Sequence, residues 1–308
     1  DTSSINFEGW HLAILRSGQN EHERAFWMSY DTGRRHGHVN GLSIGLFARG
    51  LDLLPDFGYL PVHRGGWSGP HVDWYKSSAA HNTVIIDGQN QALDTEGQTG
   101  LWQIDDGVQM MKVCAPAMYG IQRYERTCVM IDIDEEHFYI VDLFEVESLP
   151  WTGPGGCKDH TFFLRGPEST ITTTGLELEE SKPYGHGTQM RNHRIHDNVA
   201  PGWSVTWKHA HADVNLRYTG LSEGMSVGTA ESWVSAGKWT YEDLWIPTLK
   251  VTGQGDSSTF VGVIDVFGDA PIVENVETSV SEDGVDVHVT LTNGLERTTR
   301  VPSLNQDV

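Results

Sequence analysis

The chain has 308 residues, enough for a large core, and its 34 glycines and 11 tryptophans, with few helical repeats, favour a mostly β protein. Against 21 Lys and Arg stand 42 Asp and Glu, a formal net charge of −21 that argues against nucleic acid and membrane surfaces as partners. No stretch approaches the ~18 apolar residues of a membrane span, and the three cysteines lack the spacing of a disulfide scaffold or a cysteine zinc site.

Short runs rich in β-branched and aromatic residues predict strands along most of the chain. Three dipeptides typical of hairpin turns adjoin such runs: Asp87-Gly88, Asp283-Gly284 and Asn293-Gly294. The regular spacing favours an all-β, antiparallel β-sandwich over alternating βαβ units. The predicted strands are 41–48, 82–86, 108–113, 127–133, 138–144, 161–164, 214–218, 260–266, 285–289 and 289–292.

We expect residues 1–308 to form one domain. A loop rich in proline and glycine marks a subdivision near 150–158. The first residues, Asp-Thr-Ser-Ser, lack the basic and apolar regions of a signal peptide. We therefore interpret the chain as mature, trimmed or excised.

The segment 34–43 contains a His-x-His pair, His36 and His38. In an extended chain, residues two apart point to the same face, so both imidazoles would line one cleft. Two imidazoles and a carboxylate form a common zinc site. By itself the pair fits equally well two surface or packed histidines that make ordinary hydrogen bonds.

Two further motifs supply candidate ligands. Asp56 lies among apolar residues in the run 53–59, where an unpaired charge would be costly and a metal would compensate it. A turn residue that caps its own backbone is the alternative interpretation. His81 stands at the entrance of the apolar strand 82–86, where it is either a ligand or a simple strand cap.

Three motifs in this order, His36-Gly37-His38, then 54–59 (Leu-Pro-Asp-Phe-Gly-Tyr), then 81–84 (His-Asn-Thr-Val) with Asp87-Gly88, resemble the heparinase II/III-like family of polysaccharide lyases. The similarity is specific over 28–91 and diffuse beyond. It implies a C-terminal β-sandwich that packs against an N-terminal (α/α) toroid, with the substrate cleft between them. We expect this chain to be the sandwich part, without the toroid.

By the same resemblance, His38, Asp56 and His81 match positions that hold a structural zinc. His36 matches an active-site histidine, and Tyr75 is the candidate catalytic tyrosine. Relatives often carry Asp where this chain has Asn40, which changes a charge near the expected metal.

A lyase of this kind neutralises the uronate carboxylate, removes the C5 proton and protonates the departing O4 oxygen. His36 and Tyr75 have suitable chemistry for the proton transfers. An acidic polysaccharide also needs local positive charge and aromatic faces for its sugar rings. The candidate substrate-binding residues are Arg34, Arg35, Tyr59, Arg64, Trp67 and Trp74, with Lys76 as a further basic residue.

Two other functions stay open at this point. A zinc-containing carbohydrate-binding module would need no chemistry from the sandwich. A metal-dependent hydrolase would place water on a catalytic zinc, but no general-base Glu stands beside His38. The family resemblance further implies a secreted or periplasmic protein.

Overall fold

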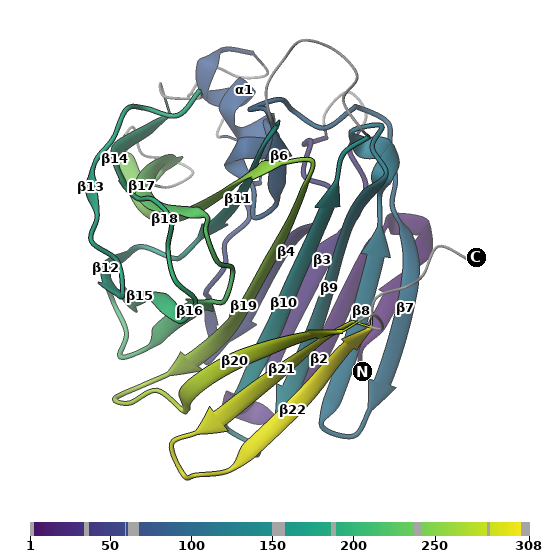
Figure 1. The fold of residues 1–308 in the computed structure, drawn as a ribbon, viewed down its shortest axis with the longest axis vertical. Coiled ribbons are helices and arrows are strands. Elements are labelled where there is room, and N and C mark those ends of the chain that lie inside the picture. Colours follow the sequence, from purple (N-terminus) through teal and green to yellow (C-terminus); the bar gives the residue numbers. More distant parts are fainter. Residues whose placement is uncertain are drawn as a thin grey trace.

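The computed structural model describes residues 3–33, 37–58, 60, 68–149, 158–185, 189–236, 242–281 and 284–302. Within them the chain forms four antiparallel sheets and very little helix (Figure 1). The predicted all-β, antiparallel sandwich is confirmed. None of the helices in these residues has the length and hydropathy of a membrane span.

The main sandwich has an eight-stranded sheet on one side and two smaller sheets on the other. The eight strands are, in order, β12 (Ser169–Thr174), β15 (Trp203–His209), β16 (Asn215–Gly220), β19 (Ser257–Phe267), β10 (Phe138–Glu147), β9 (Arg123–Asp132), β8 (Val108–Cys114) and β7 (Gln98–Asp105). The five-stranded sheet is β1 (Ile5–Phe7), β2 (Leu12–Ser17), β3 (Arg24–Ser29), β4 (Ser43–Ala48) and β5 (Leu51–Asp52). The six-stranded sheet is β13 (Glu179–Glu180), β14 (Met190–His196), β17 (Ser226–Ser235), β18 (Asp243–Gly255), β11 (Lys158–Arg165) and β6 (Val84–Ile86).

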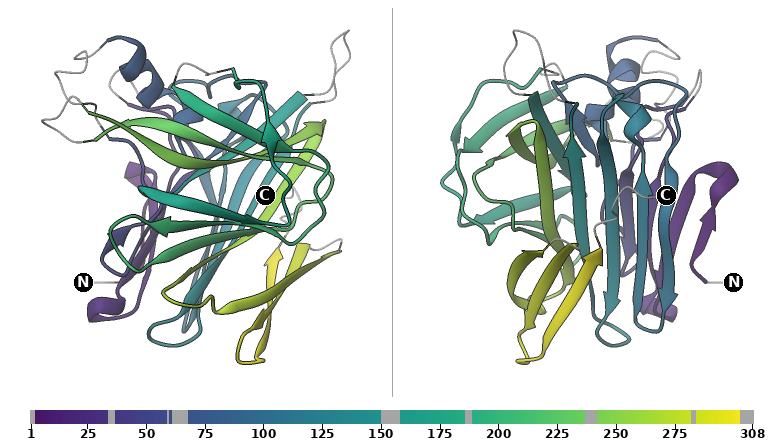
Figure 2. Two further views of the ribbon diagram at one scale, coloured as in Figure 1. Left: turned by 90° about the vertical axis from the view of Figure 1, so that its left-hand side faces the viewer. Right: turned by 45° about the vertical axis from the view of Figure 1, so that its right-hand side comes forward.

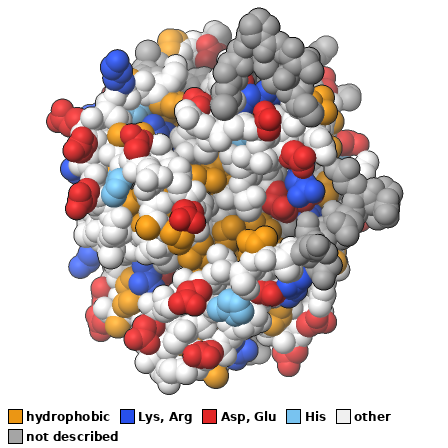
Figure 3. All heavy atoms as spheres, viewed as in Figure 1, with side chains coloured by type: hydrophobic (Ala, Val, Ile, Leu, Met, Phe, Trp, Pro, Cys, Tyr) orange, Lys and Arg blue, Asp and Glu red, His pale blue; other side chains and the backbone are white. Residues whose placement is uncertain are grey.

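A three-stranded sheet covers the other face of the eight-stranded sheet (Figures 1 and 2). It consists of β20 (Val273–Ser281), β21 (Gly284–Leu291) and β22 (Glu296–Pro302). Strand β10 is apolar along most of its length because both its faces are buried: Ile140 belongs to the main core and Val141 to the core under β20–β22. Figure 3 shows carboxylates spread over the face with β20–β22, not gathered in one patch.

A third apolar cluster lies on the outer face of the six-stranded sheet, beneath the helix α1 (Pro70–Lys76) and the 3-10 turn η4 (Ser78–Ala80). Pro70 fits the first helical turn because its missing N–H has no partner there in any helix. The helix ends at Lys76, and the hydroxyl of the next residue, Ser77, donates to the Trp74 carbonyl. Further 3-10 turns are η1 (Glu8–Trp10), η2 (Asn20–His22) and η5 (Pro116–Met118).

Every strand predicted from the sequence overlaps an observed one. The runs 285–289 and 289–292 are one strand, β21, and not two. Asp87 and Gly88 both have positive φ (50° and 66°), as a type I′ turn requires. The turn at Asn293-Gly294 is closed by the Gly294 N–H on the Leu291 carbonyl. Asp283 and the loop 150–157 lie outside the described residues.

Candidate metal centre and pocket

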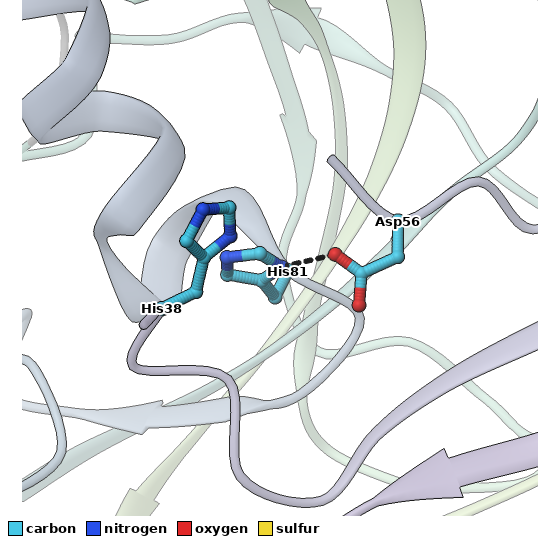
Figure 4. A group of neighbouring side chains, drawn as sticks. All are labelled: His38, Asp56 and His81. Carbon is cyan, nitrogen blue, oxygen red and sulfur yellow. Dashed lines mark hydrogen bonds and ion pairs between the residues drawn. The ribbon is translucent and has the colours of Figure 1, made fainter. Parts of the chain in front are cut away.

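Three ligand-type side chains from three separate segments meet beside α1 (Figure 4). His38 comes from the connection between β3 and β4, Asp56 follows β5, and His81 lies between η4 and β6. One ligand atom of each lies within 4.8 Å of the others. Nδ1 of His81 is 2.7 Å from Oδ1 of Asp56, and the two imidazole centroids are 5.1 Å apart. Two imidazoles and a carboxylate form a donor set that zinc accepts.

The imidazole of His81 is oriented by the backbone of α1. Its Nε2 lies 2.9 Å from the carbonyl oxygen of Tyr75. Because a carbonyl only accepts hydrogen bonds, Nε2 carries the proton and Nδ1 points at Asp56. A histidine whose second nitrogen donates to a carbonyl is the usual arrangement of a metal ligand. The ring is wholly buried, so this orientation is fixed.

The surroundings of His38 and Asp56 favour the protonation states in which these two side chains bind metals. Burial, followed by the positive charge of His81, lowers the pKa of His38 to about 4. Burial would raise the pKa of Asp56, but the charge and hydrogen bond of His81, helped by His38 and Asn40, hold that pKa below its usual range. His38 is therefore neutral and Asp56 ionised at neutral pH, as metal ligands must be.

Helix α1 also ties the His38 segment to the outer cluster. The Lys76 carbonyl accepts the N–H of Val39, next to His38, at 2.9 Å. The Trp74 indole donates to the Trp233 carbonyl at 3.0 Å, which anchors the helix on β17. The Tyr75 hydroxyl accepts the N–H of Ser235 at 2.9 Å. The helix thus fixes both histidines through its own last carbonyls.

Two buried arginines hold the segment that contains His81. Arg126, from β9, pairs with Asp142 at 2.6 Å and donates to the Leu42 and Asn82 carbonyls at 2.8 and 2.6 Å. Arg165, from the end of β11, donates to the His81 carbonyl at 2.8 Å. Burial lowers the pKa of Arg165 to about 9, so its guanidinium is still charged at neutral pH.

A pocket of about 360 Å³ opens beside His38 and Asp56. Its lining residues are Asp31, Gly33, Gly37, His38, Asn40, Asp56, Phe57 and Gly58. Gly33 and Gly37 lie so close that a Cβ on Gly33 would be 2.4 Å from the Gly37 Cα, and the Gly33 N–H donates to the His38 carbonyl. The described residues 37–40 belong to no strand, and His36 lies outside the described residues, so the expected common face of His36 and His38 stays a prediction.

The predicted site residues fall into three groups. His38, Asp56 and His81 come together as predicted. Trp74 and Tyr75 are 3% and 7% exposed and belong to the cluster under α1, so neither lines the pocket. The other six lie outside the described residues: Arg34, Arg35, His36, Tyr59, Arg64 and Trp67. The first three of them stand in the sequence between Gly33 and Gly37, which line the pocket.

Sequence reasoning missed Asp31, Arg126 and Arg165. Asp31 lines the pocket, and burial raises its pKa. The two arginines had one available signal: each is a charged residue within or at the end of an apolar strand, where a charge needs a partner. The sequence does not show which partner that is.

Residues 2–148 match the family model described as "Heparinase II/III-like, C-terminal". Over this segment, just under half of the chain, the sequence is that of a heparinase II/III-like C-terminal domain. The matched segment contains all three ligand-type residues. Over 120 residues the chain is also 29% identical to the heparin-sulfate lyase of Bacteroides stercoris, a match that covers 39% of this chain and 16% of that protein.

Solved structures extend this likeness to the fold of nearly the whole chain. The heparan sulfate lyase HepC from Pedobacter heparinus superposes with a TM-score of 0.71 at 16% identity, covering 97% of this chain and 42% of that one. A heparinase III structure gives a TM-score of 0.66 at 13% identity, with 98% and 43% covered. The chain therefore has their C-terminal β-sandwich fold and spans less than half of their length.

Proposed function

We propose that this chain is the β-sandwich half of a polysaccharide lyase that cleaves a uronic-acid-containing polysaccharide by β-elimination. The observation that carries the proposal is the position of the His38, Asp56 and His81 cluster, which adjoins the pocket and lies within the family-matched segment. The partner would be an (α/α) toroid domain or chain that closes the cleft from the other side.

The same three residues would hold a zinc ion. The donor types, their spacing, the neutral His38 and the orientation of His81 by the Tyr75 carbonyl all fit this metal. When bound, zinc would supply a fixed positive charge and join three segments of the chain. We infer a structural metal, because metal binding of this kind is coupled to local folding.

His36 is proposed to handle the C5 proton or to recognise the carboxylate, because Gly33 and Gly37 on the pocket wall flank it in the sequence. Arg34, Arg35 and Arg64 would neutralise the uronate, and Tyr59 and Trp67 would stack on sugar rings. Tyr75 and Trp74 keep their proposed roles in proton transfer and stacking only if substrate reaches the cluster under α1. Their burial makes a packing role the competing assignment.

The test is the near-ultraviolet absorbance of the unsaturated uronate that elimination produces and hydrolysis does not. We would assay uronate polymers with this chain alone and with the chain joined to a toroid. His36→Ala should lower turnover by roughly 10²–10⁴-fold. His288→Ala, at an exposed position of β21, is the matched control and should act as wild type. Hydrolysis products without absorbance would refute the lyase.

A carbohydrate-binding module is the second candidate. The observation in its favour is that the described pocket lining contains no tyrosine, while the Tyr75 ring packs on Phe57 at 5.0 Å. Calorimetric titration with uronate oligosaccharides separates the two functions. Saturable binding without new absorbance, even with a toroid present, would establish the module.

A further inference from the structure

The side chain of Asn82 links two of the segments that carry candidate ligands. Its amide donates to the Ile44 carbonyl at 3.0 Å and to the Pro55 carbonyl at 3.5 Å. Its Oδ1 accepts the backbone N–H of Arg165 at 2.9 Å. Because Asn82 follows His81 and Pro55 precedes Asp56, one fully buried amide holds two ligand segments at a fixed separation.

Arg165 contacts the same two segments. Its guanidinium donates to the carbonyls of His81 and Ala79 and to the Ser232 hydroxyl, which are all neutral acceptors. Its Cζ lies 5.9 Å from the ring centroid of Phe57, the residue after Asp56. The side chain therefore contacts residues at both the His81 and the Asp56 segments.

Stability alone does not account for this arginine. A buried guanidinium loses its hydration, and a well-packed apolar residue of similar size is often as stabilising or more so. Arg126 compensates its burial with the bidentate partner Asp142. The guanidinium of Arg165 instead donates to backbone carbonyls around the ligand His81, where a fixed fork of donors sets the direction of the chain.

We propose that Asn82 and Arg165 are the positioning residues of the metal centre, which set the separation and orientation of His81 and Asp56 before an ion binds. This inference rests on the metal site of the proposed function. Neither residue touches the ion: both act through the backbone of the ligand segments. Partners of this kind typically change metal affinity by roughly 10–100-fold when they are removed.

The experiment measures Zn²⁺ affinity of the full 308-residue chain by competition with a chromophoric chelator, and the visible spectrum of the Co²⁺ form. The variants are Asn82→Ala and Arg165→Lys. Matched controls are Asn215→Ala and Arg217→Lys, since Asn215 donates to the Gly268 carbonyl and Arg217 to the Val273 carbonyl, both away from the site. If Asn82→Ala does not fold, Asn82→Asp retains the size and the acceptor oxygen.

We expect the two site variants to bind Zn²⁺ roughly 10–100-fold more weakly and to change the Co²⁺ spectrum. The controls should lose comparable thermal stability in the metal-free form and bind as wild type does. If the site variants bind Zn²⁺ as tightly as the wild type and give the same Co²⁺ spectrum, the positioning role is overturned, while the proposed metal centre is not. A wild-type chain that binds no Zn²⁺ would overturn the metal centre of the proposed function as well.

Discussion

His81 illustrates what the sequence reveals at the scale of single residues. A histidine at the entrance of a buried strand needs partners for both nitrogens, and an aspartate among apolar residues needs a positive neighbour. The structure gives each the other as a partner, with Nδ1 of His81 2.7 Å from Oδ1 of Asp56. Each motif alone supplied only part of a possible set of metal ligands. The fold makes a candidate site of them because it brings His38, Asp56 and His81 to one location.

Tyr75 offers a test of role at this scale. Its hydroxyl accepts the N–H of Ser235, so we expect Tyr75→Phe to lower the unfolding free energy by about 1 kcal/mol. Since the ring is buried under α1, turnover should fall less than about tenfold, whereas loss of a proton-transferring group costs roughly 10²–10⁴-fold. Urea unfolding measures the unfolding free energy and the absorbance assay measures turnover, with Tyr119→Phe as the control. A larger loss of turnover would restore Tyr75 as the catalytic tyrosine.

Residues that support the ligands were beyond prediction. Arg165 stands 84 positions from His81, and only the pairing of β11 with β6 and β18 brings its guanidinium to that carbonyl. Asp31 reaches the pocket for a similar reason, from the end of β3. Partners far apart in sequence depend on sheet order, which one sequence does not specify.

Strand β11 shows how one element serves two cores. His160, Phe162 and Leu164 face the main sandwich, while Phe163 and Arg165 face α1. The strand was predicted because its run of apolar residues needs no alternation when both faces are covered. His160 is a fully buried member whose ring nitrogens meet the hydroxyls of Ser258 and Ser148, at 2.9 and 3.3 Å.

A pH dependence follows from His160. Burial lowers its pKa in the folded protein, so below pH ~6.5 the unfolded chain takes up a proton that the folded chain resists. Its contribution to stability is therefore present at neutral pH and is lost as pH falls from ~6.5, by at most about 1.4 kcal/mol per pH unit. In His160→Gln, the unfolding free energy should fall less steeply between about pH 7.5 and pH 5.5 than in the wild type. Urea unfolding at several pH values measures this, and an equal fall of the unfolding free energy in the two proteins would contradict it.

Other strands escaped prediction for identifiable reasons. β12 alternates half-buried and exposed residues and is almost entirely Thr and Ser, so it lacks an apolar stripe. β18 contains Pro247, which normally argues against a central strand. Here the Pro247 carbonyl still accepts the Trp207 indole N–H at 3.1 Å and the backbone N–H of Gly166 at 3.3 Å, and the strand continues through it.

The net negative charge is a property of the whole molecule. A formal net charge of −21 produces self-repulsion that is stronger in the folded state than in the unfolded chain, and carboxylates are spread over the face drawn in Figure 3. The acidic polysaccharide that we propose as substrate would therefore need local basic residues to approach. The assignment of 1–308 to a single domain stays a prediction.

Salt should stabilise the protein. Raising NaCl from about 20 to about 500 mM shortens the Debye length well below the size of the molecule and screens the repulsion. Relief of about 1 kcal/mol would raise Tm by about 2–4 °C in a protein of this size. Scanning calorimetry with a chelator present measures the effect, and KCl should act as NaCl does. A Tm that is constant or falls with salt would contradict the argument.

The eight-stranded sheet lies between two apolar cores, and this position determines which part of the fold unfolds first. Strands β10 and β19 contribute to the cores on both faces, so separating either uncovers apolar surface on two sides at once. The sheet β20–β22 covers only one of these cores and can detach at a lower free energy. Partial unfolding would then begin at the C-terminal sheet, while the loops of His38, Asp56 and His81, anchored on the far side of the middle layer, keep their arrangement.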